Sequence, residues 1–152
     1  MLTDALSYDL PEFTRVTAPS TTAQVINGIC VIEAGEYDRH GERVRLSFYQ
    51  QRGRIAGINI IWDGWPGGWF PRYLPIKFGD DVVPLVTEYQ QETPLIEARL
   101  FNVNGGWVTD GIKRSNNIRI EHKELGVIDL PTGDLYRTGK ALTDCAQKHF
   151  PA

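Results

Sequence analysis

The chain of 152 residues is poor in cysteine and histidine and carries no strong excess of either charge. Its two cysteines, Cys30 and Cys145, match neither a paired metal motif nor a C-x-x-C redox motif. The three histidines do not occur at a spacing that coordinates zinc. A formal net charge of -3 offers no basic field to a phosphate backbone, so nucleic-acid binding is not expected. We predict neither a metal site nor a cofactor.

Long apolar runs are also missing. No stretch approaches the roughly 20 consecutive apolar residues that span a bilayer, because Asn27, Asn59 or a proline interrupts the short runs that exist. The N-terminal residues lack the basic start and the continuous apolar middle of a secretory signal. We expect no membrane span, and either an intracellular protein or a mature chain that begins with an added methionine.

Alternation of apolar and polar residues, the pattern of a half-buried strand, recurs through most of the chain. The segments 44–49 and 55–62, with a turn at 51–54, predict a hairpin. An earlier strand is expected to begin near Val25. The remaining expected strands cover 74–78, 82–86, 96–103, 107–109, 117–122 and 127–130. Many short strands separated by turn residues predict a mainly β fold, an antiparallel β-sandwich or barrel-like sheet.

The two ends of the chain have different patterns. Near the C-terminus, apolar residues at three- and four-residue steps predict one α-helix from Gly139 to about Lys148, with Thr138 as its N-cap. Residues 1–22 contain two prolines and a polar run, which predict an extended N-terminal arm. Residues 23–152 are then a single β-rich domain that includes the C-terminal helix.

Cys30 and Cys145 have two interpretations. In an oxidising compartment a bridge between them would close a loop of roughly 115 residues and contribute on the order of 4 to 5 kcal/mol in the chain-entropy model. In a reducing compartment they are two small buried hydrophobic side chains. The predicted location therefore depends on the state of the cysteines. The protein is expected to be periplasmic or secreted if they are bridged, and cytoplasmic otherwise.

The densest chemical information lies in residues 62–73, which hold three of the four tryptophans among glycines and prolines. Rigid aromatic faces are typical of binding surfaces, which predicts a contact site. Its expected members are Trp65, Trp69, Phe70 and Tyr73, with Trp107 beside a second glycine-bearing turn. The alternative is structural: Trp62 ends a strand in the core, and the following tryptophans fold back over an open edge of the sandwich.

Catalytic signatures are incomplete. His40 and His122 lie in polar segments without a nucleophile or an oriented partner beside them, which favours exposed turns or strand ends. Glu88, Glu92 and Glu97, or the pair Asp63 and Asp110, are candidates for the two carboxylates of a glycosidase. No serine has a G-x-S-x-G context, and the double glycines do not form a phosphate-binding loop. We predict no catalytic residue.

The order of several features resembles small bacterial envelope proteins related to the invasion-associated locus B family. These features are Cys30 in an early strand, the strand pair 44–48 and 55–62, the segment 128–133 and a closing helix with Ala141 to Cys145. The resemblance implies a secreted β-sandwich without a settled catalytic function. It also implies a periplasmic or surface interaction role, with Cys30 and Cys145 oxidised.

The leading hypothesis is a non-enzymatic binding module of the bacterial envelope that contacts another protein or a cell-wall glycan through the aromatic loop. A second hypothesis is a glycan-acting hydrolase. A third is an assembly subunit of a phage or secretion machine, in which the N-terminal arm adds a strand to a neighbouring subunit. A homo-oligomer is possible.

Overall fold

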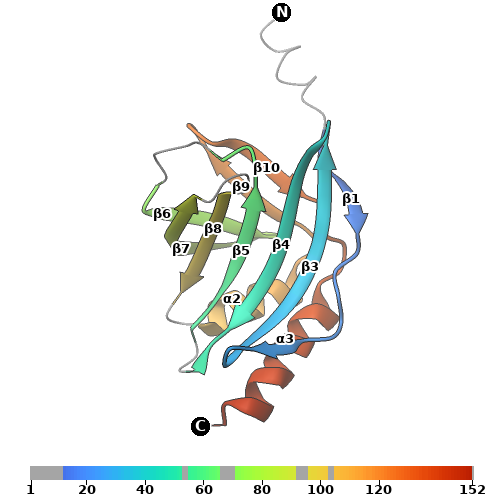
Figure 1. The fold of residues 1–152 in the computed structure, drawn as a ribbon, viewed down its shortest axis with the longest axis vertical. Helices are drawn as coiled ribbons and strands as arrows, with labels where there is room; N and C mark the ends of the chain where they lie inside the picture. The colour runs from blue at the N-terminus through green and yellow to red at the C-terminus, as the bar shows by residue number, and fades with distance from the viewer. Residues whose placement is uncertain (1–11, 53–54, 66–70, 92–95, 103–104, 152) are drawn as a thin grey trace, which may run out of the picture.

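The computed structural model describes residues 12–52, 55–65, 71–91, 96–102 and 105–151, with the backbone alone at 86–91, 96–102 and 105–107. Ten strands and two helices follow one another along this part of the chain (Figure 1). In chain order they are β1 (Thr14–Thr17), β2 (Gln24–Ile26), β3 (Ile29–Arg39), β4 (Glu42–Gln50), β5 (Ala56–Trp62), β6 (Tyr73–Phe78), β7 (Asp81–Gln91), β8 (Ile96–Asn102), α2 (Gly105–Arg114), β9 (Ile118–His122), β10 (Gly126–Leu130) and α3 (Tyr136–His149).

The strands form one antiparallel ladder in the order β1-β3-β4-β5-β8-β7-β6-β9-β10, and β2 also pairs with β3. This ladder bends so that β6, β9 and β10 lie behind β3, β4 and β5 as a second layer (Figure 1). In the described ladder β1 and β10 are not paired with each other, so the sheet does not close into a barrel. The prediction of a mainly β, antiparallel, sandwich-like fold with a C-terminal helix is therefore confirmed.

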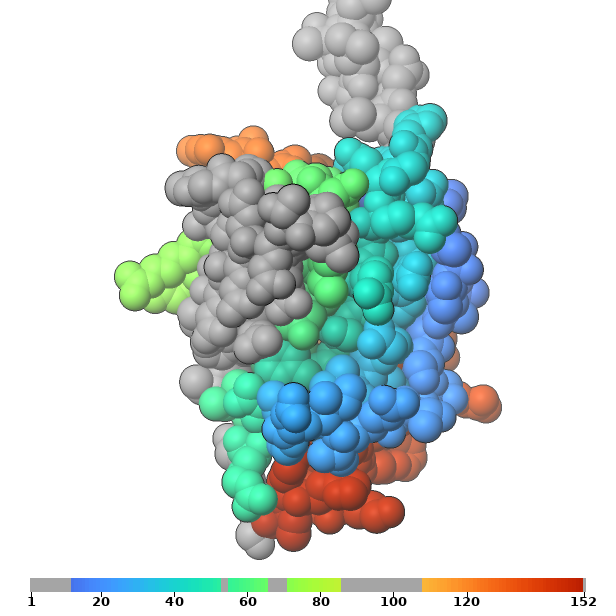
Figure 2. All heavy atoms as spheres, in the orientation of Figure 1, coloured from blue at the N-terminus to red at the C-terminus, as the bar shows by residue number. Residues whose placement is uncertain are grey.

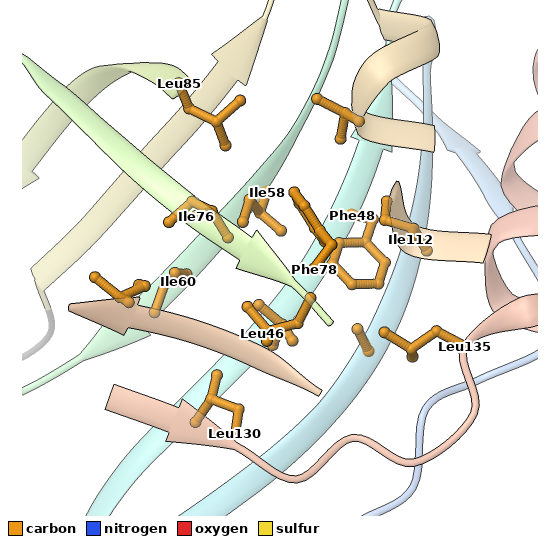
Figure 3. Packing of buried hydrophobic residues seen from close by; sticks show 14 of the residues in the cluster. Leu46, Phe48, Ile58, Ile60, Ile76, Phe78, Leu85, Ile112, Leu130 and Leu135 are labelled. Carbon is orange, nitrogen blue, oxygen red and sulfur yellow. The ribbon is translucent and has the colours of Figure 1, made fainter. Parts of the chain in front are cut away.

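The core lies between the two layers, because the strands alternate buried and exposed residues along their length. β6 shows the pattern most clearly: Leu74, Ile76 and Phe78 are buried, and the residues between them are exposed. Their side chains meet those of β4, β5 and α2, among them Phe48, Ile58 and Ile112 (Figure 3). Burial of apolar side chains at roughly 25 cal/mol per Å² is the main force that holds the layers together.

Helix α2 corrects the prediction of a strand at 107–109 and of a turn at the preceding glycines. Val108 and Ile112, four residues apart, are both buried and belong to the core. Gly111 lies against the ring of Phe78, where an added Cβ would come 3.1 Å from the ring Cδ2 atom. The three glycines of this segment have low helix propensity, and packing against the sheet overrides that preference.

Helix α3 starts earlier than predicted, at Tyr136, and Thr138 is not its N-cap. The Thr138 hydroxyl instead donates a hydrogen bond to the carbonyl of Ser20 at 2.8 Å, which ties the first turn of the helix to the N-terminal segment. The backbone N–H of Tyr136 donates to Asp134 Oδ1 at 2.9 Å, so this carboxylate satisfies one of the free donors at the helix start.

The segment predicted as an N-terminal arm joins the fold from residue 13 onward. Phe13 belongs to the core, and β1 pairs with β3 through registers such as Arg15 with Tyr37. Residues 1–11 lie outside the described residues.

Cys30, the second residue of β3, forms a disulfide with Cys145 of α3 across a separation of 115 residues. The bridge attaches the C-terminal helix to the sheet. It is compatible with an oxidising compartment such as the periplasm. In the described part of the chain, neither helix is both long and apolar enough to cross a bilayer.

Candidate functional site

The structure divides the predicted aromatic contact site. Trp65 is only 3% exposed, and its indole N–H donates a hydrogen bond to the carbonyl of Ile60 at 3.1 Å. Trp69 and Phe70 lie outside the described residues, and at Trp107, in the first turn of α2, only the backbone is described. Tyr73, the first residue of β6, is 62% exposed. Of the predicted contact residues with a described side chain, Tyr73 alone lies at the surface.

Trp65 belongs to an aromatic cluster that covers one end of the core. Its ring meets that of Trp62 edge to face at 4.8 Å, and Trp62 meets Phe13 in the same way at 6.4 Å. The guanidinium of Arg39 lies 4.3 Å from the centre of the Phe13 ring, a cation–π contact. Trp62, the last residue of β5, is buried in the core, as the structural alternative expects, and Trp65 is buried beside it.

The exposed side of the β6–β7 hairpin carries a compact apolar surface. Tyr73, Pro75 and Lys77 alternate with buried residues along β6, and Val82 and Pro84 do the same along β7. The strand register sets Pro75 opposite Pro84 and Lys77 opposite Val82, so all five belong to one face of the sheet. We call this set of five residues the hairpin face. Figure 2 shows the yellow-green atoms of the 71–85 segment projecting at the left edge of the molecule.

The prolines of the hairpin face occupy the positions in these strands where a missing N–H does least damage. Pairing of β9 with β6 covers Ile76 to Phe78, and pairing of β8 with β7 starts at Val86. Pro75 thus lies beyond the end of the described β6–β9 pairing, and Pro84 precedes the first described residue pair of β7 with β8. Proline lacks the N–H donor that a central strand position requires, which is why it is confined to such places.

The tip of the hairpin is a two-residue turn that fixes how the face is presented. Phe78 pairs with Asp81, and Gly79 between them has φ of +62°, a value that glycine adopts without strain. Val82 is 56% exposed, although valine is among the residues most often buried. The apolar side chains of the hairpin face are therefore exposed to solvent, and strand pairing fixes the backbone that carries them.

A polar hollow of about 820 Å³ adjoins the hairpin face and shares Lys77 with it. It lies over the outer side of β6, β9 and β10, beside the α2–β9 connection. Its lining is almost wholly polar and consists of Lys77, Gly79, Asp80, Lys113, Arg114, Ser115, Asn116, Asn117, Arg119, Glu121, Asp129 and Asp134. The lining contains four basic and four acidic residues, so the hollow as a whole carries no net charge.

Most charges in the polar hollow are already paired. Arg119 contacts Asp129 at 3.1 Å and Glu121 at 3.6 Å, and the Asn117 amide donates to the other oxygen of Asp129 at 3.1 Å. Lys77 forms no ion pair with any side chain that the structure describes. An ammonium group at the border of an apolar face is thus free to meet a carboxylate of a partner.

The catalytic alternatives receive no geometric support from the described residues. Asp63 follows β5 and is exposed, and Asp110 lies in α2, where its carboxylate is 3.9 Å from the ammonium of Lys113. Neither lines the polar hollow. The side chains of Glu88, Glu92 and Glu97 lie outside those described. The described residues contain no group of three or more His, Cys, Asp or Glu side chains arranged to hold a metal ion.

Sequence reasoning found Tyr73 but missed the rest of the hairpin face. The signal was present in the alternation of 73–78, where Tyr73, Pro75 and Lys77 share one parity and the core residues share the other. Applied to 82–85, the same rule groups Val82 with Pro84. What the sequence did not supply is the register that puts the two sets side by side.

Comparison of the chain with models of known families, with curated proteins and with solved structures gave no match.

Proposed function

We propose that this protein is a non-enzymatic binding module of the bacterial envelope, and that it contacts a partner protein through the hairpin face. The observation that carries the proposal is the exposure of Tyr73 and Val82 on a hairpin that strand pairing keeps fixed. Contiguous apolar residues at the surface of a soluble domain are typical of interaction sites. A rigid tyrosine supplies contact area at low entropic cost.

Charge defines the kind of partner. Lys77 stands in the same face as Tyr73 and Val82, and Arg72, the residue before β6, is exposed. Neither cation forms an ion pair with a described side chain. The complementary surface therefore presents apolar side chains beside a carboxylate. The Cys30–Cys145 disulfide supports the envelope as the place where the two proteins meet.

The experiment replaces Tyr73 with a photo-reactive benzoylphenylalanine and crosslinks the protein in its native host. The matched control carries the same group in place of Tyr136, which is 52% exposed on α3. We expect a discrete protein adduct from position 73 and none from position 136. Adducts of equal yield from both positions, or none from either, would refute the proposal, and binding to purified cell-wall glycan alone would replace the protein partner with a sugar.

With the captured partner purified, variants measure the contribution of the face. Tyr73→Ser and Val82→Ser should each raise the Kd by roughly 30-fold, as expected for the loss of about 2 kcal/mol at a central contact. Lys77→Glu should weaken binding more than Lys77→Met does, because it places two carboxylates together. Lys123→Glu is the charge control, since Lys123 is exposed in the turn between β9 and β10. Equal Kd values for wild type and Tyr73→Ser would contradict the assignment.

A further inference from the structure

The hairpin face is one half of a larger outer surface that continues onto β9 and β10. The register sets Val82 of β7 beside Lys77 of β6, and Lys77 beside Arg119 of β9. Arg119 in turn pairs with Asp129 of β10. These four residues alternate with buried residues along their strands, so they share the outer side of the second layer. We call them the Lys77 row.

A second row lies two residues further along each of these strands, on the same outer side. It contains the facing prolines Pro84 and Pro75 of the hairpin, and Glu121 of β9 facing Val127 of β10. Pro75 and Glu121 each lie one residue beyond the end of the β6–β9 pairing, so the two halves of the row adjoin. Val127 is 43% exposed, so apolar surface continues from the hairpin to β10. We call these four residues the Glu121 row.

The Lys77 row lacks a carboxylate. Lys77 and Arg119 are directly opposite each other on neighbouring strands, an arrangement that is unfavourable for like charges. Arg119 is paired with Asp129 at 3.1 Å. Lys77 has no such partner among the described side chains. An incoming carboxylate would therefore meet two adjacent cations, of which one is unpaired.

Glu121 has the complementary property. Its side chain is 62% exposed, and it contacts Arg119 at 3.6 Å, a longer distance than that of the Arg119–Asp129 pair. Its neighbours in the row are the apolar residues Pro75 and Val127. The hairpin face requires a partner surface with apolar side chains beside a carboxylate, and the Glu121 row is a surface of this kind.

We propose that the partner of the hairpin face is a second copy of this chain, bound face to face about a two-fold axis, an inference that rests on the proposed function. In a two-fold interface the same surface serves both copies, so a contact from residue i to residue j occurs twice. An axis in the plane of the interface, directed across the strands between the two rows, sets the Lys77 row of each copy over the Glu121 row of the other.

This axis brings opposite charges together. Glu121 of the second copy lies over Arg119 and one strand spacing, about 4.8 Å, to the side of Lys77, which is within reach of a lysine side chain. The contact occurs twice, once in each direction. Each Lys77 thereby gains a carboxylate, and each Glu121 is placed between two cations.

The apolar residues meet in the same arrangement. Val82 lies over Pro84 of the second copy, because the two belong to different rows of the same strand. Tyr73, two residues beyond the Glu121 row on β6, lies over the hairpin turn of the second copy. Gly79 in that turn has no side chain to obstruct the tyrosine ring. A photo-reactive group at position 73 should therefore label residues 79 and 80 of the second copy.

Sedimentation of the intact, oxidised chain over a range of concentrations tests the proposal, and we expect a reversible equilibrium between monomer and dimer. Lys77→Glu and Glu121→Lys should each raise the dimer Kd at least tenfold, because each brings like charges together twice. Lys77→Met and Glu121→Gln should raise it less, because they remove a charge without reversing it. Lys123→Glu, in the turn between β9 and β10 and outside both rows, should leave the Kd unchanged.

An equimolar mixture of Lys77→Glu and Glu121→Lys separates a two-fold contact from a general effect of charge. Each variant alone has two repulsive pairs, whereas in the mixed dimer both pairs are attractive. The mixture should therefore dimerise with nearly the wild-type Kd. Far-ultraviolet circular dichroism equal to that of the wild type shows that each variant is folded.

The inference would be overturned by a wild-type chain that stays monomeric, by a dimer whose Kd ignores both charge reversals, or by folded variants whose mixture does not dimerise. A monomeric chain that captures a different protein at position 73 would overturn this inference and leave the proposed function standing. The absence of any adduct at position 73 would remove both.

Discussion

Tyr37 is a buried side chain of β3 whose hydroxyl donates a hydrogen bond to the carbonyl of Ala34 at 2.7 Å. Burial raises the pKa of this phenol well above its ordinary value of 10.0, an effect that the nearby positive charge of Arg15 partly opposes. The neutral form is favoured because the low-dielectric core penalises the phenolate. The fold therefore holds a proton at Tyr37 under conditions in which the unfolded chain releases it.

This proton makes stability fall in alkaline solution. Below pH 10 both states of Tyr37 are neutral and its contribution is complete. Above that pH the unfolded chain ionises and the folded one does not, so stability is lost at up to about 1.4 kcal/mol per pH unit. Urea unfolding between about pH 9 and 11 should show this slope, and Tyr37→Phe should flatten it. The same slope in Tyr37→Phe would rule out this residue as the cause, and Tyr136→Phe controls for an exposed tyrosine.

Gly35 shows how one backbone position constrains β3. It has φ of +105°, and an added Cβ would lie 2.6 Å from the carbonyl oxygen of Thr17 and 2.8 Å from the Tyr37 hydroxyl. A positive φ costs an L-residue roughly 1 to 2 kcal/mol, and crowding of a packed site adds about 1 to 3 kcal/mol. Gly35→Ala should therefore lower the free energy of unfolding by about 3 kcal/mol.

Gly126 provides the matched comparison, because it has φ of +85° but nothing within 4 Å of an added Cβ. Gly126→Ala should cost only the backbone component, about 1 kcal/mol. Urea denaturation of the two variants separates the contributions. Equal losses would mean that the backbone conformation, and not the contact with Thr17 and Tyr37, dominates at Gly35.

At the level of elements, the strands were largely predictable and α2 was not. In a strand with one buried side, apolar and polar residues alternate along the sequence, as they do in 44–49 and 55–62. The structure confirms that these two strands pair, from Val44 with Trp62 to Gln50 with Ala56. Helix α2 starts with two glycines and contains a third. Its helical state depends on Val108 and Ile112 packing on the sheet, which no local preference reveals.

The link between α3 and β3 is the element-scale feature with the largest expected energy. The disulfide of Cys30 and Cys145 closes a loop of 115 residues, for which the chain-entropy model predicts a contribution on the order of 4 to 5 kcal/mol. The double variant Cys30→Ala with Cys145→Ala should lose most of this, with a lower urea midpoint. Wild type treated with a thiol reductant should unfold at nearly the same midpoint as the variant. A wild-type midpoint that does not respond to reductant would show that the bridge does not stabilise the fold.

At the scale of the whole molecule, the sequence predicted the class of fold but not how the sheet is arranged. Local alternation marks each strand, whereas the order that brings β8 between β5 and β7 is decided by long-range packing. The candidate site divides in the same way. Tyr73 was identified from its aromatic context, but its neighbours on the hairpin face became visible only with the register of β6 and β7.

One continuous core predicts how the molecule unfolds. The buried cluster draws side chains from both layers of the sheet and from both helices, including Phe48, Phe78, Ile112 and Leu142. No described segment holds a separate core that would remain folded after this one is lost. Because the described residues share one core, we expect the chain to unfold in one cooperative step. Cooperativity here reflects the bend of the sheet, because opening either layer exposes the apolar side of the other.

Two optical signals test this with the disulfide intact. Far-ultraviolet circular dichroism follows the strands, and near-ultraviolet circular dichroism follows the packed indoles of Trp62 and Trp65, which lie in contact at one end of the core. Their urea transitions should coincide in midpoint and steepness. If the indole signal vanished at a lower urea concentration than the strand signal, the aromatic end of the core would be opening on its own. In that case Trp65 would become accessible to a partner after all, and the contact site would extend from the hairpin face into residues that the folded structure buries.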